Sequence, residues 1–231
     1  MNIAKERVVV LGGTSGIGYA VAEAAVERGA EVVVVSRNEQ RVREAAERLG
    51  ATGRTADLGH APTGLFDEIG PFDHLVYTAG EQLALTPMAS LDVEQAREFF
   101  GVRYFGALAA VRAALPHLRE GGSITLTSGT AADRPGPGWA VASSICGAVE
   151  GLTRALAVEL APIRVNAVKP GVTRSPMWGA DVEQFYAETA AAVPLRRVGE
   201  VADVADAYLY LIGQPFTTGT VLTVDGGALL A

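Results

Sequence analysis

The glycines of LGGTSGIG, residues 11–18, have a spacing that can do chemistry. They follow a β-branched run and open an apolar-periodic segment, which places them between a strand and a helix. Gly12 permits a tight turn, Gly16 lets the backbone approach a ligand, and Gly18 lets the helix pack close to the strand. Free N–H groups at a helix start favour phosphate groups. The motif predicts a dinucleotide pyrophosphate site, although a tight turn alone is the other interpretation. Thr14, Ser15 and Ile17 complete the predicted site.

The next strand ends in Ser36, Arg37 and Asn38. An acidic residue there would hold the ribose diol of NAD, whereas a small neutral residue followed by arginine suits the 2′-phosphate of NADP. We therefore expect NADP(H), although an ordinary solvated arginine at a helix start is the alternative. Four residues that follow later strands are expected to line the adenine and ribose: Asp57, Leu58, Ala79 and Gly80.

The composition limits the function classes. A net charge of −7 argues against a nucleic-acid partner or an anionic membrane surface, since both attract basic faces. The single cysteine permits no internal disulfide and no zinc cluster, so no metal site is predicted and a cytoplasmic location is expected. The sequence contains no stretch of about 18 consecutive apolar residues, so no membrane span is expected.

Strand and helix patterns alternate along the 231 residues. This alternation predicts an α/β, doubly wound, Rossmann-type three-layer fold in a single domain, 1–231. The segment 172–198, rich in alanine, is expected to form a substrate flap, with a plain surface insertion as the alternative. Continuous apolar runs predict strands at 7–11, 31–35, 73–78, 123–127, 163–168 and 220–224, with a weaker one at 51–57. Helices are expected at 17–28, 39–49, 93–118, 140–160 and 201–212.

These motifs together resemble the short-chain dehydrogenase/reductase family. The likeness rests on GGTSGIG, on YTAG (77–80) where the family has NNAG, on GGSITLTSG, on GLTRALAVELAPIRVNAVKPG (151–171) and on TGTVLTVDGG. It implies a seven-stranded parallel sheet, hydride transfer between a nicotinamide and a small-molecule carbonyl or alcohol, and a homodimer or homotetramer. Pro170, Gly171, Thr173 and Ser175 would then lie on the nicotinamide side, and Trp139 and Trp178 would line the substrate pocket.

The residues that move the proton in this family are missing. The resemblance implies Asn, Ser, Tyr and Lys at four positions, which an ungapped alignment on GLTRALAVEL assigns to Arg103, Gly129, Ala142 and Cys146. In the family, the tyrosine gives the proton while the lysine lowers its pKa and holds a ribose. A positioned general acid contributes roughly 10²–10⁴ in rate, so an efficient enzyme needs a substitute.

Lys169, Arg103 and Ser128 are the candidate substitutes. If Lys169 and Arg103 face the pocket, they could stabilise an oxyanion or clamp a carboxylate, and a desolvated Lys169 beside Arg103 would have a lowered pKa. The alternatives are a lysine stem packed along the strand, an arginine bonded to backbone carbonyls at a bend, and a serine that points away. The expected function is an NADP(H)-dependent oxidoreductase with a non-standard proton donor. A cofactor-binding pseudoenzyme and a non-redox enzyme, for an elimination or cyclisation, remain open.

Overall fold

The computed structural model describes residues 3–82, 85–180 and 182–231. Its centre is a parallel seven-stranded sheet in the order β3-β2-β1-β4-β5-β6-β9, which confirms the predicted doubly wound fold. The weak strand predicted at 51–57 is present as β3. The strands are β1 (Arg7–Leu11), β2 (Glu31–Ser36), β3 (Thr52–Thr55), β4 (Phe72–Tyr77), β5 (Leu118–Thr127), β6 (Arg164–Pro170) and β9 (Val221–Val224).

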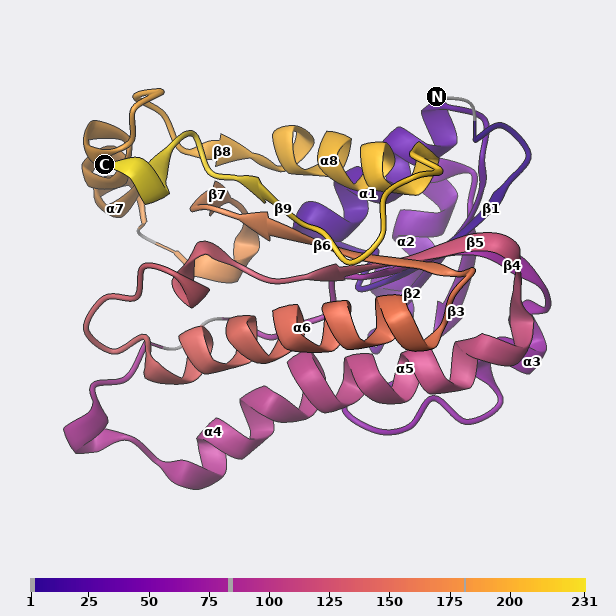
Figure 1. The fold of residues 1–231 in the computed structure, drawn as a ribbon, viewed down its shortest axis with the longest axis horizontal. Helices are drawn as coiled ribbons and strands as arrows, with labels where there is room; N and C mark the ends of the chain where they lie inside the picture. Colours follow the sequence, from indigo (N-terminus) through magenta and orange to yellow (C-terminus); the bar gives the residue numbers. More distant parts are fainter. Residues whose placement is uncertain (1–2, 83–84, 181) are drawn as a thin grey trace.

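Helices cover both faces of the sheet (Figure 1). One layer holds α1 (Gly16–Glu27), α2 (Glu39–Leu49) and α8 (Val201–Gly213), and the other holds α3 (Leu65–Ile69), α4 (Val93–Phe100), α5 (Ala107–Ala114) and α6 (Ala140–Glu159). Alternate residues of β1 belong to different cores: Val8 packs towards α1 and α8, whereas Val9 packs towards α5 and α6. Burial on both faces explains why these strands are continuously apolar.

Helix α6 is long and apolar enough to span a membrane by length and composition. In the fold it packs against β5 and β6 and buries Ile145, Val149 and Leu156 in the core. A helix that covers a sheet needs this apolar character, so its composition has an explanation within the fold.

The predicted helix 93–118 is wrong in its middle and at its end. A π-helical segment, Gly101–Gly106, separates α4 from α5, and β5 already begins at Leu118. The Tyr77 hydroxyl donates to the Val102 carbonyl at 2.5 Å, a partner that helical periodicity cannot reveal. A side chain at Gly106 would lie 2.2 Å from the Leu58 carbonyl oxygen, so glycine allows this close approach to the sheet. Pro116 has no N–H to extend the helix further.

The segment between β6 and α8 lies beside the C-terminus, at the left of Figure 1. It contains β7 (Thr173–Arg174), a 3-10 turn at Pro176–Trp178, α7 (Glu183–Ala192) and β8 (Gly199–Glu200), which pairs with β7. Tyr186 of α7 is buried, and the Arg174 guanidinium lies 4.4 Å from its ring centroid. The flap predicted for 172–198 therefore has a packed base, and its movement stays a prediction.

Candidate active site

The first turn of α1 is built around three glycines at the carboxyl ends of β1 and β4. A side chain at Gly12, whose φ is 92°, would lie 2.7 Å from the Ala79 nitrogen. A side chain at Gly18 would lie 2.3 Å from the Gly12 carbonyl oxygen. The N-cap residue Ser15 makes no side-chain capping bond, so the N–H groups at the start of α1 stay available to an anion. A β-carbon at Gly16 would lie 3.7 Å from the Ser175 side chain, so residues from two loops border the predicted phosphate site.

The residues after β2 and β3 have different roles. Arg37 is two-thirds exposed and lies 3.8 Å from Glu81 in a loose ion pair, so its guanidinium is accessible at this edge. Asn38 accepts a bond from the Arg41 N–H at 2.9 Å, which makes it the N-cap of α2. The Leu58 side chain is buried in the core.

Asp57 lies after β3 and accepts a hydrogen bond from the Gly59 N–H at 2.9 Å. This bond, together with the one from His60, lowers the pKa of Asp57 below its ordinary value. This loop therefore carries an ionised Asp57, and its contact with an adenine stays a prediction.

The four positions that the alignment assigns to the family's catalytic residues converge. A side chain at Gly129 would lie 3.2 Å from the Cys146 sulfur. Ala142 lies one turn before Cys146 on α6. Arg103 enters from the π-helical segment, and its charge acts on the Cys146 thiol. Burial raises the pKa of that thiol to about 11, so Cys146 is a neutral thiol at neutral pH and no nucleophile.

Lys169 is buried beside two carboxylates, of which Glu150 is mostly buried and Asp133 is half exposed. Its ammonium lies 2.8 Å from Glu150 Oε1 and also binds Asp133. Burial lowers the pKa of Lys169, but the bonds to Asp133 and Glu150 outweigh burial and the net pKa is raised. The predicted lowering of this pKa is therefore wrong, because carboxylates rather than Arg103 surround the ammonium.

Ser128 is a further partner of Glu150. Its hydroxyl donates to Glu150 Oε1 at 2.9 Å and is 3.3 Å from the Cys146 carbonyl oxygen. The hydroxyl is directed onto α6, where it holds Glu150 in place, and its contact with a substrate stays a prediction.

The predicted substrate residues lie together. The ring centroids of Trp139, before α6, and Trp178, in the 3-10 turn, are 6.0 Å apart. Phe185 of α7 extends this aromatic wall, with 5.0 Å between its centroid and that of Trp178. The Trp178 indole N–H donates to the Thr173 carbonyl at 3.0 Å, which fixes its ring beside the residues after β6. Pro170 ends β6, and the Gly171 N–H bonds to the Val224 carbonyl at 2.9 Å.

The sequence alone does not predict the contacts of Glu150 and Glu81. Glu150 follows Ala142 and Cys146 at intervals of four on α6, so helical periodicity could have placed it on the same face. Glu81 directly follows the TAG motif, but nothing in the sequence shows that its carboxylate meets Arg37 and that its carbonyl accepts from Arg103.

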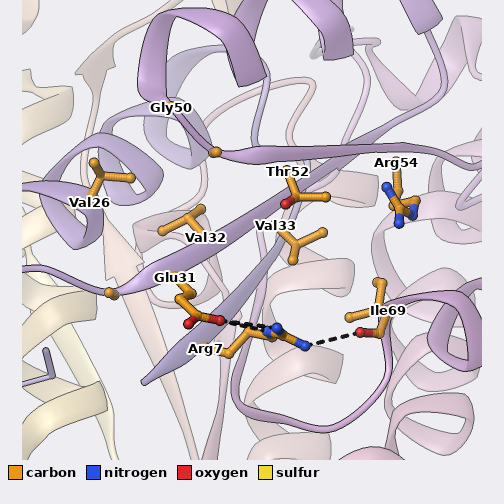
Figure 2. Close-up of a pocket in the computed structure, with 11 residues that line it drawn as sticks. Arg7, Val26, Glu31, Val32, Val33, Gly50, Thr52, Arg54 and Ile69 are labelled. Atoms are coloured by element: carbon orange, nitrogen blue, oxygen red, sulfur yellow. Dashed lines mark hydrogen bonds and ion pairs between the residues drawn. The ribbon is translucent and has the colours of Figure 1, made fainter. Parts of the chain in front are cut away.

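A cavity of about 380 Å³ lies at the amino-terminal ends of the strands, opposite the candidate active site. Figure 2 shows that Arg7, Glu31 and Thr52, the first residues of β1, β2 and β3, line it. Arg7 is paired with Glu31 at 3.0 Å and also bonds to the Ile69 carbonyl. Parallel sheets bind ligands at the carboxyl ends of their strands, so this cavity is separate from the candidate active site.

Known proteins agree with this geometry. A family model described as enoyl-(acyl carrier protein) reductase matches residues 12–228. The short-chain dehydrogenase/reductase fsr5 of Gibberella fujikuroi is 35% identical, over 100% of this chain and 97% of that relative. This chain belongs to the short-chain dehydrogenase/reductase family. As a short-chain dehydrogenase/reductase, it falls in an oxidoreductase family that uses nicotinamide cofactors and acts on small molecules.

Two solved relatives cover almost the whole of this short-chain dehydrogenase/reductase. A small-chain dehydrogenase in complex with NADPH is 35% identical with a TM-score of 0.86, covering 98% of this chain and 100% of its own. The MalC reductase/Diels-Alderase of Malbranchea aurantiaca is 31% identical with a TM-score of 0.91, covering 99% and 98%.

Proposed function

We propose that this short-chain dehydrogenase/reductase is an NADP(H)-dependent oxidoreductase that acts on a small-molecule carbonyl or alcohol. The observation that carries the proposal is the uncapped start of α1, pressed by Gly12 and Gly18 against the ends of β1 and β4, with Arg37 accessible beside it. When bound, NADPH would supply the hydride. The chain must bind it, orient it and handle one proton for each carbonyl reduced.

Arg37 supports NADPH over NADH. Its guanidinium is exposed and its partner Glu81 is 3.8 Å away, so a dianionic 2′-phosphate can displace that contact. Because no Asp or Glu follows Ser36 at the strand end, nothing there selects a ribose diol. A charge-assisted hydrogen bond is worth about 1.5–3 kcal/mol. We therefore expect Arg37→Ala to weaken the binding of NADPH about 10- to 100-fold and the binding of NADH by less than about threefold. Arg41→Ala, an exposed arginine one turn further on α2, is the matched control.

We propose that Lys169 and Asp133 together replace the missing proton donor. The half-exposed Asp133 carboxylate can exchange protons with water, while the buried ammonium holds it in place. An alkoxide is a much stronger base than an amine, so an ammonium with a raised pKa can still protonate it. A general acid works best with a pKa near the operating pH, so this donor is slower than one matched to neutral pH. Arg103 is not needed as the acid.

The aromatic wall of Trp139, Trp178 and Phe185 favours an apolar substrate. It also keeps a second candidate open, a cyclisation within the pocket, since a solved relative is named both reductase and Diels-Alderase. We further propose a single domain with a mobile flap at 172–198, a homodimer or homotetramer, and a cytoplasmic location with neither nucleic-acid nor membrane partners.

One assay tests these alternatives. Purified protein is mixed with NADPH and a panel of carbonyl compounds, and the absorbance of the reduced cofactor is followed alongside product analysis. We expect turnover that Lys169→Met reduces by at least about tenfold. Lys5→Met, which changes the chain's other lysine, should have no effect. Tight NADPH binding with no turnover of any compound would show a pseudoenzyme, and product formed without NADPH oxidation would show a non-redox enzyme.

A further inference from the structure

Arg103 places a mostly buried guanidinium on the backbone of the loop after β4. A side chain at Gly80 would lie 2.6 Å from both Cζ and Nη1 of Arg103, so the guanidinium occupies the place of that missing side chain. Nη2 donates to the Glu81 carbonyl. The ring of Phe99 lies under the guanidinium, with 5.9 Å between Cζ and the ring centroid. The guanidinium is therefore fixed on three sides.

One donor of this guanidinium, Nε, is left over. Among the residues that the structure describes, Nε of Arg103 is buried without a hydrogen bond. Oε2 of Glu81 is a buried acceptor that also has no hydrogen-bond partner within the described part of the chain. Burying polar groups without partners costs free energy, so a leftover donor and a leftover acceptor on two residues joined by the Nη2–carbonyl bond point to a ligand with both kinds of group. A vicinal diol has both.

The location indicates which diol. Ala79, the residue before Gly80, lies against Gly12 of the phosphate site. On the other side, Arg103 acts electrostatically on Cys146, which faces Gly129. The guanidinium thus lies between the start of α1 and the converged positions on α6. Arg37, the residue after β2, is assigned to the adenosine end of the cofactor.

We infer that Arg103 and Glu81 hold the ribose diol on the nicotinamide side of the cofactor, a proposal that rests on the proposed dinucleotide binding. Arg103 donates to a ribose oxygen, and the Glu81 carboxylate accepts from a ribose hydroxyl. Because Glu81 also contacts Arg37, the same residue links the two halves of the cofactor site. Arg103 is thus a positioning residue that acts on the cofactor and leaves the substrate to other groups.

Binding of fragments tests this assignment without turnover. Titration calorimetry of wild type, Arg103→Met and Arg37→Ala compares NADPH with 2′,5′-ADP, which lacks the nicotinamide ribose. We expect Arg103→Met to weaken NADPH about 10- to 100-fold and leave 2′,5′-ADP within twofold of wild type. Arg37→Ala should weaken both ligands equally. Glu81→Gln should weaken NADPH binding by a smaller factor, since an amide oxygen still accepts a hydrogen bond from a hydroxyl group.

Three outcomes would contradict the inference or the premise beneath it. Equal weakening of both ligands by Arg103→Met would place Arg103 on the adenosine side, and unchanged NADPH binding would remove it from the cofactor site. If Arg103→Met does not fold, Arg103→Lys replaces it, because lysine keeps the positive charge. The affinity of this variant for NADPH should lie between those of wild type and Arg37→Ala, and its affinity for 2′,5′-ADP should be unchanged. Failure of the wild type to bind either ligand would instead overturn the proposed function.

Discussion

Replacing Lys169 with methionine should destabilise the protein strongly. The side chain of Lys169 is 8% exposed and that of Glu150 is 12% exposed, so the substitution leaves Glu150 charged and mostly buried. Its remaining partners are the Ser128 hydroxyl at 2.9 Å and a loose 4.0 Å ion pair with the exposed Arg154. Removing one member of a buried pair costs about 3–5 kcal/mol. We take the lower end, about 3 kcal/mol, because Asp133 is half exposed and regains water when its partner is lost. For a chain of this length, that corresponds to a fall in Tm of about 6–12 °C.

Urea denaturation followed by circular dichroism measures this change at pH 7. The double variant Lys169→Met/Glu150→Gln should recover at least about half of the loss, because the amide has no charge to bury. The raised pKa of Lys169 means that folding strengthens its hold on a proton. Its contribution is therefore complete below the unfolded lysine value of about 10.4 and is lost as pH rises through the folded pKa. A single variant within about 0.5 kcal/mol of wild type at pH 7 would refute the reasoning.

Three further predictions concern residues elsewhere in the fold. Gly18→Ala should abolish NADPH binding and lower Tm, because the added carbon would lie 2.3 Å from the Gly12 carbonyl oxygen and 2.4 Å from Thr78 Oγ1; a variant that melts and binds like wild type would contradict the close packing. Cys146→Ala should keep NADPH turnover within about twofold, because a thiol with a pKa of about 11 takes no part in catalysis at neutral pH; a loss of tenfold or more would count against this. Burial lowers the pKa of His74, and the bond to Glu6 offsets part of this effect. As pH falls below about 6.5, His74 therefore takes up a proton in the unfolded chain while it stays neutral in the folded chain. Wild type should therefore lose stability more steeply than His74→Gln between pH 7 and 5.5, by at most about 1.4 kcal/mol per pH unit in urea titrations, and identical slopes would contradict this.

The sequence predicts the sheet well because each strand is a local signal. Runs such as RVVVL and EVVVV are apolar over their whole length, and only a strand buried on both faces requires that. The glycine turn at 11–18 is equally local. The π-helical segment is not, because it depends on the Tyr77 hydroxyl reaching Val102 from a strand 25 residues earlier in the chain.

The candidate site is only partly predictable for the same reason. Positions 129, 142 and 146 are assigned to the family's catalytic residues by alignment, and the fold brings them together. The partners of Lys169 do not follow, because Asp133 and Glu150 lie on a different loop and helix. The sign of its pKa shift depends on those partners, so it could be obtained only from the three-dimensional arrangement.

The contact between Gly129 and Cys146 bears on how this site could change over evolutionary time. A serine at 129 would bring its β-carbon to 3.2 Å from the Cys146 sulfur, so that sulfur would have to shift by a few tenths of an ångström. A lysine restored at 146 would place a second positive charge beside Arg103, which like-charge repulsion disfavours. Each of these residues thus meets a cost that is set by its neighbour in this structure. A serine at 129 and a lysine at 146 should therefore be tolerated better together with changes at Cys146 and Arg103 than one at a time.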